Sequence, residues 1–206
     1  MTLFLFLLFI CLCVLGRVFL QYRLTGNHGI RPAGKDSPPL QIVASVLLVL
    51  SALLILFYTL GQVLGYLHAN FEPSYFQRFG GYLLYIVGLV LVLVAQYQMG
   101  SAWRIGVDPD EKTELITQGL FRHIRNPIYT GLFVGGIGLL LISPSFILFI
   151  GLLLGYIAVE LFVRKVEEPY LQEQFGSEYS SWLHSTPRYF PKLYSRKSSS
   201  KAGQSL

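Results

Sequence analysis

The chain has 206 residues, of which 53% are hydrophobic and only 13% are charged, and its mean hydropathy is +0.53. Soluble domains usually carry about 25% charged residues, so this composition excludes a disordered chain, a collagen-like repeat and a water-soluble globular enzyme. The net charge of +5 does not indicate nucleic-acid binding, because the basic residues flank apolar runs, where they orient membrane helices. The sequence therefore predicts an all-α integral membrane protein.

Five apolar runs follow one another along the chain, and a helix needs roughly 20 such residues to cross the hydrocarbon core. The predicted helices cover about Thr2–Gln21, Leu40–His68, Phe79–Gln98, Ile128–Ile142 and Phe146–Val163. Ser143, Pro144 and Ser145 separate the last two, and a proline flanked by serines ends a helix well. We therefore expect the fourth and fifth helices to form a hairpin.

The basic residues are distributed unevenly among the connections between these helices. The second connection carries only Arg78 and the fourth carries none, whereas the other connections and the C-terminal tail hold 15 of the 16 basic residues. Because cytoplasmic loops are enriched in Lys and Arg, the N-terminus is predicted outside and the C-terminus in the cytoplasm. The polar stretches 101–127 and 164–206 then share the cytoplasmic face, as a composite active site requires.

The connection before the fourth helix is the first candidate for chemistry. Pro127 suits the first turn of that helix, and Asn126 is predicted as its N-cap. Free N–H groups at a helix start favour an anionic group such as a carboxylate, and Arg122 and Arg125 would reinforce that preference. A lipid-headgroup anchor is the alternative interpretation of the same residues.

The end of the fifth helix is the second candidate, because Glu160, Arg164, Glu167 and Glu168 fall near one helical face. Glu160 lies inside the apolar run, where an acid is costly unless it is paired or faces a polar cavity. Arg164 is its predicted partner, and Glu168 could share that charge or bind a ligand cation. The alternative is a ladder of charges at the membrane boundary.

The chain after the fifth helix reads as a short amphipathic helix, followed by an aromatic and proline-rich segment that begins at Trp182. We expect it to act as a lid or a membrane anchor. Residues 195–206 are rich in Ser and Lys and are predicted to be a disordered basic tail. Residues 1–194 then form a single transmembrane domain, with a catalytic half at about 99–191.

Three motifs in this order resemble the isoprenylcysteine carboxyl methyltransferase family, which belongs with the membrane phospholipid N-methyltransferases. They are Arg125-Asn126-Pro127-Ile128-Tyr129-Thr130-Gly131, Arg164 with Glu167-Glu168-Pro169, and Phe175-Gly176-Ser177-Glu178-Tyr179. The resemblance covers about Met99–Pro191. It implies a methyltransferase that uses S-adenosylmethionine without a Rossmann fold, and that binds this cofactor at the cytoplasmic membrane surface.

The resemblance also assigns roles to individual residues. Glu168 would contact the cofactor, and Arg164 would face the reacting group of the substrate as a catalytic residue. The resemblance also implies Leu115, Ile116 and Phe121 at the adenosine and Asn126, Pro127, Ile128 and Tyr129 at the methionine end, and Arg125 is a further predicted cofactor-binding residue. Neither a metal ion nor a nucleic acid is expected as a partner.

Several lipid-like methyl acceptors in the bilayer are compatible with these residues. Arg164 could orient a carboxylate bidentately, whereas an amine must lose a proton, which makes Glu167 or Glu160 a candidate catalytic base. Asn126 stands where the isoprenylcysteine branch usually has His, and Asn is familiar in the phospholipid branch. The leading prediction is carboxyl O-methylation of a prenylated acceptor. The alternatives are phospholipid N-methylation and a non-catalytic membrane scaffold or transporter.

Overall fold

A computed structural model describes residues 1–31, 37–106 and 114–191. Within these residues the regular structure is helical, apart from one isolated bridge between Ile30 and Ile105. In chain order the helices are α1 (Thr2–Ile10), the π-helical η1 (Cys11–Leu15), α2 (Gly16–Thr25), α3 (Pro39–Val63), α4 (Tyr75–Met99), the short η2 (Gly100–Ala102) and η3 (Gly119–Arg122), α5 (Pro127–Ile142), α6 (Phe146–Phe162), the π-helical η4 (Val163–Glu167) and α7 (Glu168–Ser185). The predicted all-α class is confirmed.

Four helical stretches of the described chain are long and apolar enough to cross a membrane. They are Thr2–Thr25, Pro39–Val63, Tyr75–Ala102 and the stretch that begins at Phe146. The fourth predicted helix is α5, whose 16 residues rise only about 24 Å at 1.5 Å per residue, less than the roughly 30 Å of a hydrocarbon core. The described part therefore contains the five apolar helices that the sequence predicts, one of them short.

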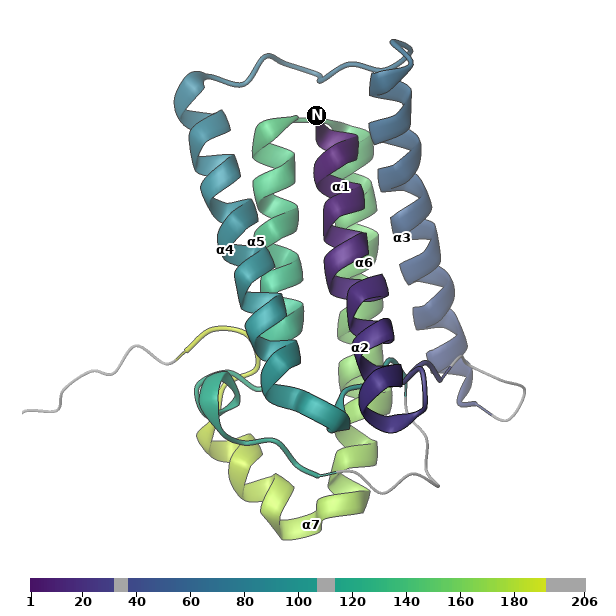
Figure 1. The fold of residues 1–206 in the computed structure, drawn as a ribbon, viewed down its shortest axis with the longest axis vertical. Helices are drawn as coiled ribbons and strands as arrows, with labels where there is room; N and C mark the ends of the chain where they lie inside the picture. Colours follow the sequence, from purple (N-terminus) through teal and green to yellow (C-terminus); the bar gives the residue numbers. More distant parts are fainter. Residues whose placement is uncertain (32–36, 107–113, 192–206) are drawn as a thin grey trace, which may run out of the picture.

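The predicted hairpin joins α5 to α6 at Ser143-Pro144-Ser145, at the same end of the bundle as the N-terminus (Figure 1). Ser145 begins α6, where its hydroxyl accepts a hydrogen bond from the backbone N–H of Ile147. Asn70, in the connection before α4, holds the turn from outside. Its N–H donates to the carbonyl of Pro144 at 2.8 Å, and its side-chain oxygen accepts from the N–H of Phe146 at 2.8 Å.

Two tightly packed helix pairs, α4 with α5 and α3 with α6, form the bundle, and α1 contacts both pairs (Figure 1). Small residues allow the close approach. A Cβ atom on Gly88 would lie 2.4 Å from the backbone nitrogen of Gly135, and the Ser51 hydroxyl donates to the carbonyl of Gly151 at 2.7 Å. In lipid, where burial of apolar surface between helices gains little, such close packing and hydrogen bonding hold helices together.

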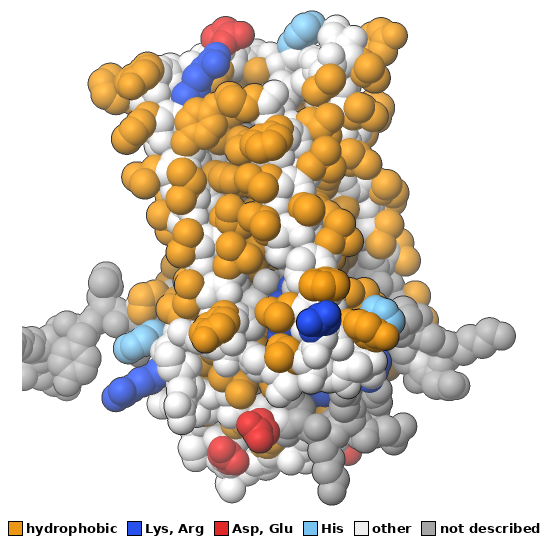
Figure 2. All heavy atoms as spheres, in the orientation of Figure 1, with side chains coloured by type: hydrophobic (Ala, Val, Ile, Leu, Met, Phe, Trp, Pro, Cys, Tyr) orange, Lys and Arg blue, Asp and Glu red, His pale blue; other side chains and the backbone are white. Residues whose placement is uncertain are grey.

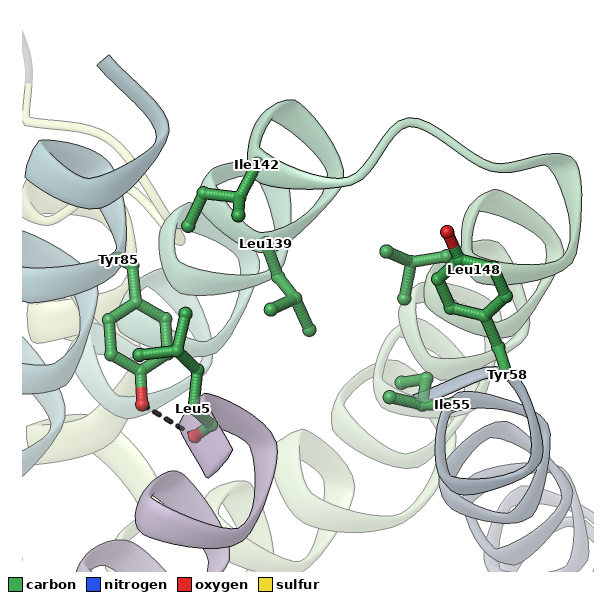
Figure 3. Packing of buried hydrophobic residues seen from close by; sticks show 7 residues of the cluster. All are labelled: Leu5, Ile55, Tyr58, Tyr85, Leu139, Ile142 and Leu148. Atoms are coloured by element: carbon green, nitrogen blue, oxygen red, sulfur yellow. Dashed lines mark hydrogen bonds between the residues drawn. The ribbon is translucent and has the colours of Figure 1, made fainter. Parts of the chain in front are cut away.

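A cluster of buried side chains from α1, α3, α4, α5 and α6 forms the core (Figure 3). Its members are Leu5, Ile55, Tyr58, Tyr85, Leu139, Ile142 and Leu148. The two phenols find polar partners there, because the Tyr85 hydroxyl donates to the carbonyl of Leu5 at 2.7 Å and the Tyr58 hydroxyl bonds that of Ser143 at 2.7 Å. This core fixes the end of the bundle that is remote from α7.

The surface separates into an apolar middle and polar ends. Figure 2 shows apolar side chains over the shaft of the bundle, with acidic, basic and histidine side chains at its two ends. Phe57 on α3 and Val90 on α4 belong to the exposed apolar set. Such a band is typical of a surface that faces lipid, and the chain is an integral membrane protein with several spans.

The helix that begins as α6 continues through η4 into α7 without a loop. A π-helical turn is frequently found at functional sites, and η4 carries Glu167 at its last position. Gly176 then bends α7, because its φ of +51° is not helical. The chain after the bend runs beside the start of α5, where the aromatic segment meets the first motif (Figure 1).

Candidate active site

A cavity of about 100 Å³ lies at the α7 end of the bundle. Four segments surround it: the end of α4 with the chain after it, the chain before α5 with the first turn of that helix, the end of α6 with η4, and α7. Eight residues that the sequence analysis predicted for the site line this cavity: Leu115, Ile116, Phe121, Arg125, Asn126, Tyr129, Glu167 and Glu168. The fold thus brings together side chains that are spread over more than 50 positions of the sequence.

Three of the assigned residues lie elsewhere. Pro127 is fully buried at the first turn of α5, and Ile128 does not line the cavity. Arg164 is more than half exposed and forms the predicted ion pair with Glu160, one turn earlier in α6. Both of these charged residues line a separate groove on α6, so Arg164 does not face the cavity in this structure.

The carboxylate of Glu168 is held by two guanidinium groups. Arg125 donates to Oε1 at 2.9 Å, and Arg188 donates to Oε1 at 3.0 Å and to Oε2 at 2.8 Å. All three side chains are largely buried, with exposed fractions between 10% and 19%. The hydrogen bond to Glu168 raises the pKa of Arg188. Glu168 therefore shares its charge with Arg125 and Arg188, and not with Arg164.

Residues 187–190, which we call the C-terminal strap, lie against the start of α5. The N–H groups of Arg125 and Asn126 donate to the carbonyls of Pro187 and Arg188 at 2.9 and 3.0 Å, and the Thr130 hydroxyl donates to the carbonyl of Tyr189 at 2.9 Å. The strap therefore occupies the N–H of Asn126 at the start of α5, where the sequence suggested an anionic ligand. Asn126 is the N-cap residue, as predicted, but its side chain makes no capping hydrogen bond and lines the cavity.

Aromatic side chains of α7 form another wall. The indole N–H of Trp182 donates to the carbonyl of Phe121 at 3.1 Å, and its ring meets that of Tyr179 edge-on. Arg104, from the chain after α4, bonds the Tyr170 hydroxyl at 3.2 Å and lies over its ring. Sequence reasoning did not assign these four residues to the site. The concentration of aromatic residues around Trp182 is visible in the sequence, but it predicts a lid or a membrane anchor there and not a wall of the site.

Glu167 lies beyond the apolar part of α6 and faces the cavity. The Tyr129 hydroxyl donates to its Oε2 at a long 3.5 Å. Burial raises the pKa of Glu167 to about 7, and the negative charge of Glu168 contributes to this rise. A carboxylate with such a pKa can accept and release a proton near neutral pH.

The carboxylates and aromatic rings that line the cavity fit a ligand that carries both a positive charge and a flat ring. Carboxylates and aromatic faces attract cations, and the rings of Phe121 and Trp182 offer surfaces for stacking. Ligand pockets usually measure roughly 300 to 1,000 Å³, so a cofactor of nucleoside size requires the walls to move apart. In the described ranges, no three His, Cys, Asp or Glu side chains are grouped as a metal site would need.

Comparison with known proteins gives two likenesses of limited extent. A nickel-cobalt-cadmium resistance protein, NccN of Alcaligenes xylosoxydans xylosoxydans, is 31% identical over 111 residues, which are 53% of this chain and 51% of the relative. The solved structure of a eukaryotic intramembrane Ras methyltransferase, isoprenylcysteine carboxyl methyltransferase, is 20% identical with a TM-score of 0.45 and covers 75% of this chain and 51% of the other. The chain thus spans about half the length of each.

The match to a family sequence model decides which family the chain belongs to. The sequence model of the phospholipid methyltransferase family matches residues 76–178. This match includes α4, α5, α6 and the motifs that hold Asn126 and Glu168. Because it extends over half of the 206 residues, the protein belongs to the phospholipid methyltransferase family.

Proposed function

We propose that the protein is an S-adenosylmethionine-dependent methyltransferase that acts on a lipid-like acceptor at the cytoplasmic membrane face. One observation carries the proposal: eight side chains that the sequence analysis predicted for cofactor binding or catalysis, from the chain before α5, the start of α5 and the junction of η4 with α7, line one cavity. Membership of the phospholipid methyltransferase family supports the reaction class. The cytoplasmic placement rests on the 15 basic residues at this end of the predicted topology.

The residues of the cavity supply what a methyl transfer needs. When bound, the cofactor provides a methyl group on a positively charged sulfur. Phe121 and Trp182 would stack on its adenine, and the Asn126 amide would bond its amino-acid end. The chain's main tasks are alignment of the two reactants and exclusion of water. Side chains of α7 wall the cavity, and the strap holds Arg125, Asn126 and Glu168 in place behind it.

Glu167 would act when the acceptor is an amine. An ammonium group must lose its proton before its nitrogen can attack, and a carboxylate with a pKa of about 7 can take it. A carboxylate acceptor needs no such base. The apolar body of the acceptor would stay in the bilayer beside the helices. We further propose that residues 1–194 act as a single domain; the predicted tail 195–206 lies outside the described residues.

Calorimetric titration of the detergent-purified protein with S-adenosylmethionine and its demethylated product tests the proposal. We expect saturable binding of both at one site. Asn126→Ala should weaken binding about three- to tenfold, because it removes a side-chain hydrogen bond of about 0.5–1.5 kcal/mol. The matched control is Gln174→Ala, which removes an exposed amide of α7 that does not line the cavity.

Two results would contradict the proposal. Absence of binding in a folded sample would favour the scaffold or transporter interpretation. Equal affinity of the wild type and Asn126→Ala would show that the cofactor binds elsewhere. Folding of each sample is checked by its thermal melting curve.

A further inference from the structure

Arg17 is a buried cation within the first helical stretch that is long enough to span a membrane, Thr2–Thr25. It belongs to α2, and only 3% of its surface is exposed. Its Nε and Nη1 atoms have no hydrogen-bond partner within residues 1–31, 37–106 and 114–191. A charged residue within a membrane span is costly and usually functional, so this buried arginine indicates a role beyond anchoring the helix.

Arg17 and Gln21 cap the end of α4. The Nη2 atom of Arg17 donates to the carbonyl of Gly100, which is the C-cap residue of α4. One turn further along α2, the Gln21 amide donates to the carbonyl of Ser101 at 2.8 Å. Carbonyl groups at the C-terminus of a helix lack partners within it and carry a partial negative charge, so a cation and an amide donor suit them. Figure 1 shows α2 beside this end of α4.

The chain after η2 is held by the same N-terminal part of the protein. The guanidinium carbon of Arg17 lies 4.8 Å from the ring centroid of Trp103, which is itself buried. The Ile105 N–H donates to the carbonyl of Gly29 at 2.8 Å, and the Ile105 carbonyl accepts from the N–H of Arg31 at 2.7 Å. This part of the chain is therefore fixed by segments that lie outside the family match.

Residues 99–106, which we call the α4 wall, contact the N-terminal part with one set of residues and the cavity with another. The first set comprises Gly100, Ser101, Trp103 and Ile105. The residues of the second set, which line the cavity, are Met99, Ala102, Arg104 and Gly106. The fit is close at Gly106, where the backbone oxygen of Arg31 leaves no room for a Cβ atom. Because the two sets are interleaved in eight consecutive residues, the first set cannot move without the second.

Arg104 is the charged member of the α4 wall. Its guanidinium bonds the Tyr170 hydroxyl at 3.2 Å and lies over that ring, and its charge reaches the carboxylate of Glu167. A displacement of the α4 wall would therefore move a cation within the cavity, as well as the apolar side chains of Met99 and Ala102. Both changes alter the surface that a bound cofactor would meet.

We infer that Arg17 and Gln21 are positioning residues of the cofactor site, which hold the α4 wall in place at the cavity by capping the end of α4. The inference rests on the proposed function. Neither side chain lines the cavity, so both act through the residues that they bond. The inference gives α2 a task in cofactor binding, although α2 lies outside residues 76–178 that the family model matches.

Calorimetric titration of the full chain in detergent with S-adenosylmethionine tests the inference, at a temperature well below every melting transition. Arg17→Ala should raise Kd at least tenfold, because the Gly100 carbonyl loses its cap and the Trp103 ring loses the guanidinium beside it. Gln21→Ala should raise Kd about threefold, because it removes one hydrogen bond between neutral groups. Arg17→Lys keeps a cation that can donate to the carbonyl, so its Kd should stay within threefold of the wild type.

Hydrogen–deuterium exchange gives a second measurement that needs no cofactor. The Ile105 amide should exchange at least tenfold faster in Arg17→Ala than in the wild type, because its hydrogen bond to Gly29 opens more often when the α4 wall is loose. In Gln21→Ala the same amide should exchange about threefold faster.

Two control variants separate positioning from general damage. Arg23→Ala is the matched control, because it removes an exposed arginine from the same helix. Leu148→Ala controls for loss of stability, because Leu148 is fully buried in the core remote from α7 and its truncation should lower the melting temperature. Both variants should bind S-adenosylmethionine with the wild-type Kd.

A folded Arg17→Ala variant with a Kd within twofold of the wild type would overturn this inference and leave the proposed function intact. The same holds if Leu148→Ala weakens binding as much as Arg17→Ala, because affinity would then follow stability alone. If Arg17→Ala does not fold, an unchanged Kd and unchanged exchange at Ile105 in Gln21→Ala would overturn the inference. A folded wild type that binds no cofactor would instead overturn the proposed function itself.

Discussion

Glu168 bonds both Arg125 before α5 and Arg188 in the C-terminal strap, so a single substitution of Glu168 should loosen the strap. Glu168→Gln keeps the shape of the side chain and removes its charge. The guanidinium groups of Arg125 and Arg188 then stay largely buried without a counter-charge. Removal of one partner from a buried ion pair costs roughly 3–5 kcal/mol. Because these side chains are 10–19% exposed, we expect the lower end, about 3 kcal/mol.

The effect should appear where the strap protects backbone amides. The N–H groups of Arg125 and Asn126 are bonded to strap carbonyls, so local opening of the strap exposes them to exchange. A loss of about 3 kcal/mol corresponds to roughly a hundredfold change in an equilibrium. Hydrogen–deuterium exchange by mass spectrometry should therefore show about a hundredfold faster exchange at these two amides in Glu168→Gln.

Two controls define the measurement. Peptides from α3 should exchange at the wild-type rate, because α3 makes no hydrogen bond to the strap among the described residues. Glu72→Gln, which breaks an exposed ion pair, should leave exchange unchanged throughout 121–133. If exchange at Arg125 and Asn126 stays within twofold of the wild type in Glu168→Gln, the Glu168 ion pairs do not hold the strap, and our reasoning about this cluster is wrong.

Two other predictions concern the helix packing and the catalytic base. Gly88→Ala should lower the free energy of unfolding by about 2–3 kcal/mol and reduce the melting temperature in detergent, because its Cβ would meet backbone atoms of Gly135 and Gly131 at 2.4 and 2.6 Å. The control Gly80→Ala should keep the wild-type melting temperature, because its Cβ meets nothing within 4 Å. Equal melting temperatures of the two variants would refute the packing argument. With an amine acceptor, kcat/KM should fall about fivefold between pH 7 and pH 6, because the pKa of Glu167 is raised to about 7 and protonation below it removes the base. The Glu167→Gln variant should lack this inflection near pH 7, and a wild-type profile without the inflection would exclude Glu167 as the base.

The sequence by itself determined the membrane class and the helices. In lipid, backbone groups must be hydrogen-bonded within the chain, so an apolar run of sufficient length has little choice but to be a helix. The Ser143-Pro144-Ser145 turn and the ion pair between Glu160 and Arg164 were also predictable, because a proline ends a helix and residues four apart on a helix are neighbours. The family motifs further indicated which segments form the cavity.

Only the tertiary structure decided the partners of the site residues. Glu168 bonds Arg125 and Arg188, which are 43 and 20 positions away, and Trp182 bonds Phe121, which is 61 positions away. Helical periodicity relates residues three or four apart. It cannot tell which helix ends will meet, because this depends on the close packing of α4 on α5 and α3 on α6 and on the bend at Gly176. The same packing separates Arg164 from the cavity, so the shape of the site follows from contacts that no local pattern encodes.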